Sequence, residues 1–275
     1  MPELPETETI ARELNRLAAG ATIAAVGVPR PDVLREIAPM ALRRRVTGAR
    51  IDRGWRRAKL IVLDLSTGDR IVVQPRFTGA LLLDRGQLDE REHAYAAVRF
   101  ELADGRAIVY RDIRRLGTVT LMAPERFDRY SAGLGHEPLD PAFGAGELSG
   151  ILRASRQAVK KVLMDQRRIA GVGNIYANEA LWRAGIDPSR AARGVDPGEA
   201  ARLHTALVSV LRESIDARGT SFRDYRDASG RTGGFAERLA VYGRAGEPCP
   251  RCGARLIGTH AIDGRSTVLC AHCQH

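Results

Sequence analysis

Four cysteines near the C-terminal end of the sequence have the spacing of a metal site. They form two Cys-x-x-Cys pairs, Cys249 with Cys252 and Cys270 with Cys273, and seventeen residues separate the pairs. Two such pairs can direct four thiolates at one zinc ion in tetrahedral geometry. Two disulfides are the alternative, which a reducing cytosol disfavours. Because four thiolates close the coordination shell, the sequence predicts one structural zinc ion per chain.

The spacer between the two cysteine pairs has the pattern of a β-hairpin. Apolar runs at Arg255–Ile257 and Thr267–Leu269 flank the turn signal Asp263-Gly264. Two short strands joined by such a turn, with a metal knuckle at each end, form a zinc ribbon. The predicted hairpin therefore belongs to the zinc site.

Pro2 could supply a nucleophile of a different kind. Initiator methionine is usually removed before a small residue, which leaves Pro2 with a free secondary amine. The pKa of an α-amino group is about 7.7–8.0, so a useful fraction is neutral near pH 7. Such an amine can attack a carbonyl-like carbon and form an iminium, with Glu3 and Glu6 close enough in sequence to move protons. Many chains begin Met-Pro without any such role, so the hypothesis that Pro2 is a nucleophile depends on other features of the sequence.

That support comes from motifs spread along the whole chain. They are Met1-Pro2-Glu3-Leu4-Pro5-Glu6, Arg56-Arg57-Ala58-Lys59, Asp165-Gln166-Arg167, Gly171-Val172-Gly173-Asn174-Ile175-Tyr176, Val241-Tyr242-Gly243-Arg244 and Gly264-Arg265-Ser266-Thr267. Together with the cysteine spacing, this set resembles the formamidopyrimidine-DNA glycosylase family from end to end. Members of that family are bifunctional enzymes that excise oxidised purines from DNA. The motif around Asn174 looks like the family's helix–two-turns–helix.

The resemblance implies a mechanism in which a damaged nucleotide is flipped out of the duplex into a pocket between two domains. Pro2 would attack the anomeric carbon of the sugar, displace the base and form a Schiff base. Glu3 would act as acid and base on the sugar, Glu6 would support the site, and Lys59 would lie near it. β,δ-Elimination would then cut the strand. The implied catalytic set is Pro2, Glu3, Glu6, Lys59 and Arg265.

The resemblance also implies DNA contacts in the second half of the chain. Arg265, at the tip of the predicted hairpin, would grip a phosphate through its guanidinium. Asn174 opens a predicted helix and could bind phosphate there, although a helix cap without a ligand explains it equally well. Lys160 could reach the DNA backbone or the flipped base, or could be a solvated charge on a helix face.

Three further positions correspond to the residues with which the family fills the vacated base stack. The family usually has methionine, arginine and phenylalanine there, whereas this chain has Phe77, Arg114 and Leu116. We expect all three to contact DNA, because a larger side chain at one position can compensate for a smaller one at another. The alternative for Phe77 is a place in the protein core.

The elements that must position these residues fall into two groups. Ile10, Leu14 and Leu17 predict an amphipathic helix over Thr7–Ala19. Short β-type runs separated by turn signals then predict a β-sandwich or barrel. These runs are Thr22–Val28, Val46–Trp55, Leu60–Leu65, Arg70–Val73, Ala80–Leu83, Val98–Leu102, Ala107–Tyr110 and Thr118–Leu121.

Helical patterns replace the strands in the second half. They cover Glu147–Ala154, Ala158–Met164, Ile175–Ala184 and Pro197–Ala217, and the polar, glycine-containing stretch Gly219–Gly234 is expected to be a mobile loop that covers the extruded base. The predicted fold class is α+β. The predicted parts are an N-terminal β-sandwich catalytic domain with a leading helix over residues 1–122, a linker over 123–146, a helical helix–two-turns–helix domain over 147–240 and a zinc finger over 241–275.

Charge and length set the wider expectations. The chain has 275 residues with 43 Lys+Arg and 33 Asp+Glu, a net charge of +10, which favours a polyanionic partner. Only three of these cations are lysines, so a coding bias toward arginine explains part of the excess. The sequence contains neither a signal peptide nor an apolar run long enough for a membrane span. We expect a monomer in the bacterial cytosol and nucleoid, acting on double-stranded DNA with damaged bases and without a membrane partner.

Two alternatives remain open at this point. The related endonuclease VIII type prefers oxidised pyrimidines, but that branch usually carries glycine where this chain has Leu4. A DNA-damage-binding homologue without catalysis is the other alternative. Such a protein would have no need of Pro2, Glu3, Glu6 and Lys59.

Overall fold

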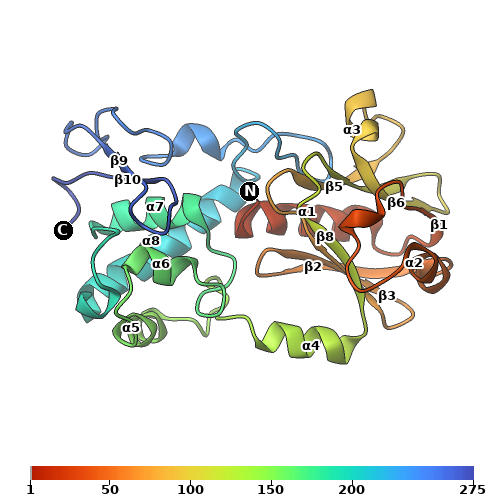
Figure 1. The fold of residues 1–275 in the computed structure, drawn as a ribbon, viewed down its shortest axis with the longest axis horizontal. Helices are drawn as coiled ribbons and strands as arrows, with labels where there is room; N and C mark the ends of the chain where they lie inside the picture. Colours follow the sequence, from red (N-terminus) through yellow and green to blue (C-terminus); the bar gives the residue numbers. More distant parts are fainter. Residues whose placement is uncertain (1) are drawn as a thin grey trace. The chain divides into compact units, whose positions relative to one another are not determined.

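The computed structural model describes residues 2–275, which fall into two units (Figure 1). The first unit runs to Ala132 and also includes residues 215–236. The second unit comprises residues 133–214 and 237–275. The predicted mobile loop therefore belongs with the strands, although the helix before it belongs with the second unit. None of the helices in residues 2–275 combines the length and the apolar character that a membrane span requires.

Two antiparallel sheets of four strands each form the first unit, in the orders β1-β6-β7-β5 and β2-β3-β4-β8. The strands are β1 (Ile23–Gly27), β2 (Ile51–Arg57), β3 (Leu60–Leu65), β4 (Arg70–Gln74), β5 (Gly79–Asp84), β6 (Ala96–Leu102), β7 (Ala107–Asp112) and β8 (Thr118–Met122). Apolar side chains from both sheets join one buried cluster, which includes Leu63, Leu83 and Phe100. This arrangement confirms the predicted sandwich.

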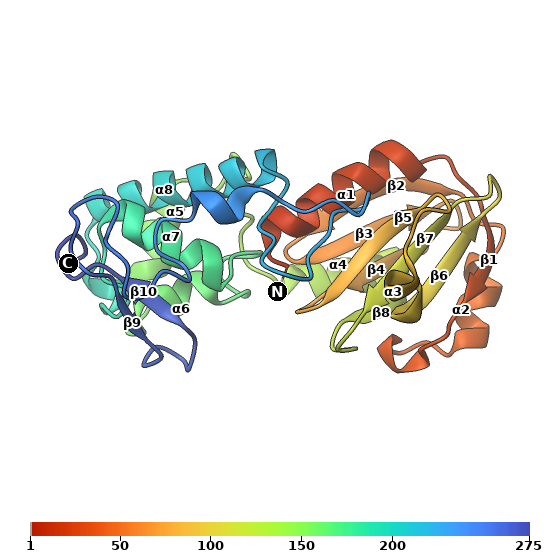
Figure 2. The ribbon, with the colours of Figure 1, turned by 90° about the horizontal axis from the view of Figure 1, so that it is seen from above.

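Helix α1 (Leu4–Ala18) begins three residues before the sequence pattern predicted. Pro5 fits the first turn of a helix, where its missing N–H has no partner to lose. Further along, α1 lies close against β2 (Figure 2). Gly54 makes this approach possible, because a Cβ there would lie 3.1 Å from the Ala11 carbonyl oxygen. The Gly54 amide also donates to the side chain of Asn15 at 3.0 Å.

Three short helices of the first unit were missed by the sequence analysis. They are α2 (Pro39–Val46), α3 (Glu90–Ala94) and α4 (Pro124–Ala132). The strand predicted from Val46 was wrong at its start, because Val46 ends α2 and β2 begins only at Ile51. Helix α4 buries a single apolar side chain, Phe127, so it carries almost no periodic signal.

The second unit contains four α-helices, the last of which ends two residues beyond its boundary, and the small hairpin. They are α5 (Ala145–Arg153), α6 (Val159–Met164), α7 (Asn174–Ala184), α8 (Pro197–Asp216), β9 (Ile257–Thr259) and β10 (Thr267–Leu269). Gln166 holds the turns between α6 and α7: its side-chain amide donates to the Val172 carbonyl at 2.7 Å and accepts from the Gly171 amide at 2.9 Å. This double contact explains why a glutamine stands in the motif.

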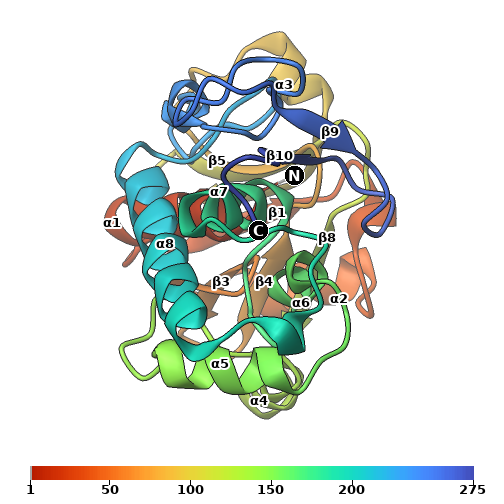
Figure 3. The same ribbon diagram turned by 90° about the vertical axis from the view of Figure 1, so that its left-hand side faces the viewer.

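Helix α7 also carries the hairpin, which lies beside it (Figure 3). Glu179 is fully buried, and its carboxylate accepts hydrogen bonds from the three backbone amides of residues 240–242 at 2.8–2.9 Å. One residue earlier, the Asn178 side chain accepts from the Val268 amide at 2.9 Å. The Glu179 bonds are charge-assisted and therefore strong, and they fix the start of the zinc region on α7. The neutral Asn178 side chain holds the second strand of the hairpin on the same helix.

Candidate active site

The carboxylates next to Pro2 are buried at the start of α1. Glu3 is 2% exposed, Glu6 is 1% exposed, and Pro2 is buried as well. The Glu6 carboxylate accepts from the Glu3 amide at 2.8 Å and, through its other oxygen, from the Thr220 amide at 2.8 Å. Glu6 thus joins the first turn of α1 to the loop that starts near Gly219.

The loop of residues 219–234 fits closely against this first turn. Gly219 has φ +87°, and a Cβ there would lie only 3.1 Å from the Glu6 Cγ atom. The Tyr225 hydroxyl donates to the carbonyls of Glu6 at 3.3 Å and Arg218 at 3.1 Å. Burial, and then the negative charge of Glu6, raise the pKa of Tyr225 well above its usual value. The hydroxyl therefore stays protonated and keeps donating.

A second cluster of charges holds the same loop. The Arg218 guanidinium donates to the carboxylates of Glu13 and Asp227, and Arg231 donates to Glu13 at 2.9 Å. Asp227 is fully buried, so its ion pairs are shielded from solvent. The mobility expected of this loop from its sequence stays a prediction. The ion pairs of Arg218 and Asp227 hold the loop against α1, while the side chain of Phe222 is 59% exposed.

Lys59 lies in the two-residue turn between β2 and β3 and is half-buried. Its neighbour Ala58 has φ 53°, in the left-handed region of backbone conformation that residues other than glycine rarely adopt. The Arg56 guanidinium donates to the Ala58 carbonyl at 3.0 Å and to the Glu8 carboxylate of α1 at 2.7 Å. The turn that carries Lys59 is thus tied to the helix that carries Glu3 and Glu6.

The three residues expected to fill the base stack lie on two neighbouring loops of the first unit. Phe77 is 49% exposed and Leu116 is 40% exposed, and the Arg114 guanidinium lies 4.9 Å from the centre of the Phe77 ring. Phe77 is therefore not a core residue. Their contact with DNA stays a prediction.

Asp112 holds these two loops together, and the sequence analysis missed it. One carboxylate oxygen accepts from the Thr78 hydroxyl at 2.6 Å, and the other accepts from the Gly117 amide at 2.8 Å and the Tyr110 hydroxyl at 3.1 Å. Burial, and then the adjacent negative charge, raise the pKa of Tyr110 far above its usual value. Asp112 stands two residues before Arg114, but no sequence pattern shows that its partners lie so close.

In the second unit, three of the predicted DNA-binding residues gather around one turn of the hairpin. Lys160 is fully buried, and its ammonium donates to the Ser266 carbonyl at 2.9 Å and the Thr267 hydroxyl at 2.7 Å. The Asn174 side chain donates to the same Ser266 carbonyl at 2.9 Å. Arg265, next to this carbonyl, has a half-exposed side chain. Lys160 therefore holds the hairpin in place, and its own contact with DNA stays a prediction.

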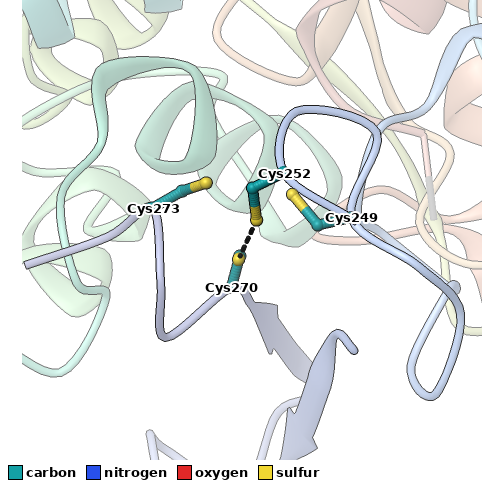
Figure 4. A group of neighbouring side chains, drawn as sticks. All are labelled: Cys249, Cys252, Cys270 and Cys273. Atoms are coloured by element: carbon teal, nitrogen blue, oxygen red, sulfur yellow. Dashed lines mark hydrogen bonds between the residues drawn. The ribbon is translucent and has the colours of Figure 1, made fainter. Parts of the chain in front are cut away.

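The four cysteines meet at the base of the same hairpin (Figure 4). Their sulfur atoms all lie within 4.8 Å of one another, and the Cys252 and Cys270 sulfurs are 3.5 Å apart. Four thiolates bound at about 2.3 Å to a tetrahedral zinc ion would be about 3.8 Å apart, so the group fits one ion. Burial would raise the pKa of the Cys249 thiol, but hydrogen bonds from the Arg251 backbone, the Trp182 side chain and the Cys252 backbone outweigh it and lower that pKa to about 6. The predicted zinc site is confirmed.

Cys252→Ala should lower the zinc content well below one ion per chain, because three thiolates leave the tetrahedral shell incomplete. We expect the hairpin to loosen and DNA affinity to fall with the metal. Metal analysis and DNA titration of the purified protein provide the measurement. His272→Ala is the matched control, since this exposed histidine lies outside the four-sulfur group. Full zinc content in Cys252→Ala would refute the four-thiolate site.

Three family models match successive parts of the chain. Residues 1–119 match the formamidopyrimidine-DNA glycosylase N-terminal domain, and residues 134–226 match the formamidopyrimidine-DNA glycosylase H2TH domain. Residues 246–275 match a zinc finger found in FPG and IleRS. The matches cover the buried carboxylates, the turns around Gln166 and the four cysteines.

Curated relatives match over the same length. A formamidopyrimidine-DNA glycosylase of Heliobacterium modesticaldum is 41% identical over the whole of both chains, and one of Moorella thermoacetica is 45% identical over 93% of each. Among solved structures, a Lactococcus lactis FPG mutant in complex with Fapy-dG-containing DNA superposes with a TM-score of 0.92, at 30% identity and full coverage of both chains. The MutM (FPG) protein of Thermus thermophilus gives a TM-score of 0.87 at 36% identity, covering 99% of this chain and 98% of the other.

Proposed function

The chain belongs to the formamidopyrimidine-DNA glycosylase family of DNA repair enzymes, which have glycosylase and AP-lyase activity, and on this premise we propose that its substrates are oxidised purines in double-stranded DNA. We name 8-oxoguanine and formamidopyrimidines as the substrate class. The observation that carries this proposal is the pair of buried carboxylates that follow Pro2, Glu3 at the N-cap of α1 and Glu6 in its first turn. We also propose that the protein acts as a monomer in the bacterial cytosol and nucleoid.

In the proposed reaction, Pro2 is the nucleophile once Met1 has been removed. Its nitrogen lone pair forms a bond to the anomeric carbon, and the glycosidic bond breaks with its electrons leaving on the base, which takes a proton from water. The Pro2 nitrogen then releases its own proton to water, which restores the lone pair that forms the iminium. Glu3 gives a proton to the sugar ring oxygen as the ring opens to the iminium. Glu3 then accepts protons during the β,δ-elimination that cuts the strand on both sides of the sugar. Met1 itself lies outside the described residues.

Glu6 and Lys59 support this chemistry in different ways. Glu6 positions the site, because its two oxygens hold the Glu3 amide and the Thr220 amide. Lys59 supplies a positive charge near the sugar and its phosphates, from a turn that Arg56 ties to α1. The loop of residues 219–234 covers the flipped base.

The remaining predicted residues bind DNA. Phe77, Arg114 and Leu116 fill the space that the flipped nucleotide leaves, and their exposure on two neighbouring loops supports this role. Arg265 and Asn174 bind backbone phosphates, and Lys160 fixes the turn that presents Arg265. In this scheme residues 1–122 carry catalysis, 123–146 form a linker, 147–240 form the helical domain and 241–275 the zinc finger.

Borohydride trapping on defined duplexes tests the proposal. We expect a covalent adduct with 8-oxoguanine duplexes whose peptide map ends at Pro2, because borohydride reduces the iminium to a stable amine. A duplex with thymine glycol serves as the comparison. Faster trapping on thymine glycol would assign the chain to the pyrimidine-directed endonuclease VIII type. Binding without an adduct on any lesion would instead show a damage-binding protein without catalysis.

A further inference from the structure

Arg111 is a buried cation that the proposed chemistry does not use. It lies in β7 with an exposure of 3%, between strands β5 and β6. Burying a guanidinium is costly unless its charge is paired and its N–H groups are bonded. The groups that pair with the Arg111 guanidinium therefore indicate its role.

The guanidinium of Arg111 reaches three separate segments of the first unit. One terminal nitrogen donates to the Thr78 carbonyl at 2.6 Å. The other donates to the Asp224 carbonyl at 2.8 Å and to the Glu92 carboxylate of α3 at 3.2 Å. The Nε atom also donates to Glu92, which balances the charge. A planar fork of this kind can serve two carbonyls at once, which a lysine ammonium does less well.

The two carbonyls belong to segments with separate proposed roles. Thr78 follows Phe77 directly, so its carbonyl belongs to the turn that carries the expected base-stack residue. Asp224 lies in the loop of residues 219–234, close to exposed Phe222. The Thr78 hydroxyl is held in turn by Asp112, which also binds the amide of Arg114 at 3.2 Å. A continuous set of hydrogen bonds thus runs from the base-stack loops to the covering loop.

We propose that Arg111 is a positioning residue that couples the entry of Phe77 into the base stack to the closing of the loop of residues 219–234 over the flipped base. The coupling rests on the proposed function, because it needs a lesion that is flipped and covered. Since both segments share one buried guanidinium, moving one without the other leaves a buried carbonyl or N–H without its partner. The two motions therefore occur together.

Arg111→Lys tests this coupling while it retains a charge for Glu92. We expect excision of 8-oxoguanine to fall about tenfold or more, since each lost charge-assisted hydrogen bond is worth about that factor. Nicking of a duplex with a preformed abasic site should stay within about twofold, because such a site has no base for the loop to cover. Arg111→Met, which removes all the donors, should show the same selective loss in larger measure.

Stopped-flow fluorescence separates the two motions directly. A 2-aminopurine beside the lesion reports entry of Phe77, and a tryptophan introduced as Phe222→Trp reports the loop. The protein with Phe222→Trp alone should show one rate constant for both signals. Adding Arg111→Lys should make the tryptophan signal slower than the 2-aminopurine signal. Arg91→Met is the matched control, because exposed Arg91 faces the Asp224 carboxylate at 3.9 Å without touching either carbonyl.

The outcomes separate this inference from the proposed function. A parent protein that forms no borohydride adduct refutes the proposed function. A parent that forms the adduct, combined with an Arg111→Lys variant that keeps one rate constant, overturns the coupling alone. Equal losses on 8-oxoguanine and abasic DNA would also overturn it, since they point to general loosening of the fold. Thermal unfolding of each variant, measured alongside, identifies such loosening.

Discussion

A form of the protein that keeps one extra residue in front of Pro2 should form no borohydride adduct with damaged DNA. The extra residue converts the secondary amine of Pro2 into an amide, whose lone pair is delocalised into the carbonyl and no longer nucleophilic. We expect both base excision and strand cleavage to fall by on the order of a thousandfold or more, as when an enzyme loses its nucleophile. Trapping yield and single-turnover rates provide the measurement.

The extension is best built as a short leader with a protease site that ends directly before Pro2. The uncut and cut forms then differ only in the leader and in the amine that it blocks, and intact-mass measurement confirms which form is present. Both forms should bind lesion DNA with similar affinity, because the residues expected to contact DNA are unchanged. An adduct in the uncut form would place the nucleophile on another residue, and Lys59 would become the first candidate.

The metal site and the main architecture could be predicted because their signals are local. Cys249, Cys252, Cys270 and Cys273 carry their geometry in their spacing, and the structure brings all four sulfur atoms together. The eight strands of the sandwich follow from short apolar runs between turn signals. The short helices α2, α3 and α4 were not predicted. A helix such as α4, with one buried apolar side chain, lacks the apolar periodicity on which helix prediction depends.

Lys160 shows why the site could be predicted only in part. On a helix face, a lysine next to Lys161 has the pattern of a solvated or DNA-binding charge. Its burial depends on the Ser266 carbonyl and the Thr267 hydroxyl, which lie more than a hundred residues further along the chain. No local pattern contains that contact, because the hairpin reaches the helix only in the folded unit.

Asp112 and Arg111 show the same limit for the first unit. Both lie within three residues of the predicted base-stack residue Arg114, yet neither belongs to a spacing pattern with a known chemistry. Asp112 acquires its role from Thr78, and Arg111 acquires its role from the carbonyl of Asp224. These are single contacts between distant segments, and each requires a buried polar group to find one particular partner. The sequence therefore indicates which residues meet the substrate more readily than which residues hold them.

Glu3→Gln should separate base excision from the later steps. The glutamine keeps the size of the side chain and a hydrogen-bonding oxygen but cannot give or accept a proton as a carboxyl group does. General acid–base catalysis contributes about 10²–10⁴-fold, so excision of 8-oxoguanine should fall by that factor in single-turnover experiments. Binding of lesion DNA should change little, because the substitution leaves the size of this buried side chain unaltered.

The nature of the remaining activity distinguishes catalysis from support of the fold. The amine of Pro2 is intact in Glu3→Gln, so incubation with a preformed abasic aldehyde should still give a borohydride adduct, even though elimination is slow. Glu125→Gln, at an exposed position in α4, removes a carboxylate elsewhere in the same unit and should leave every rate unchanged. If Glu3→Gln loses adduct formation and thermal stability together, the carboxylate serves mainly to hold the first turn of α1. If the adduct persists while excision fails, Glu3 acts as the acid on the sugar during excision and not as a support of the fold.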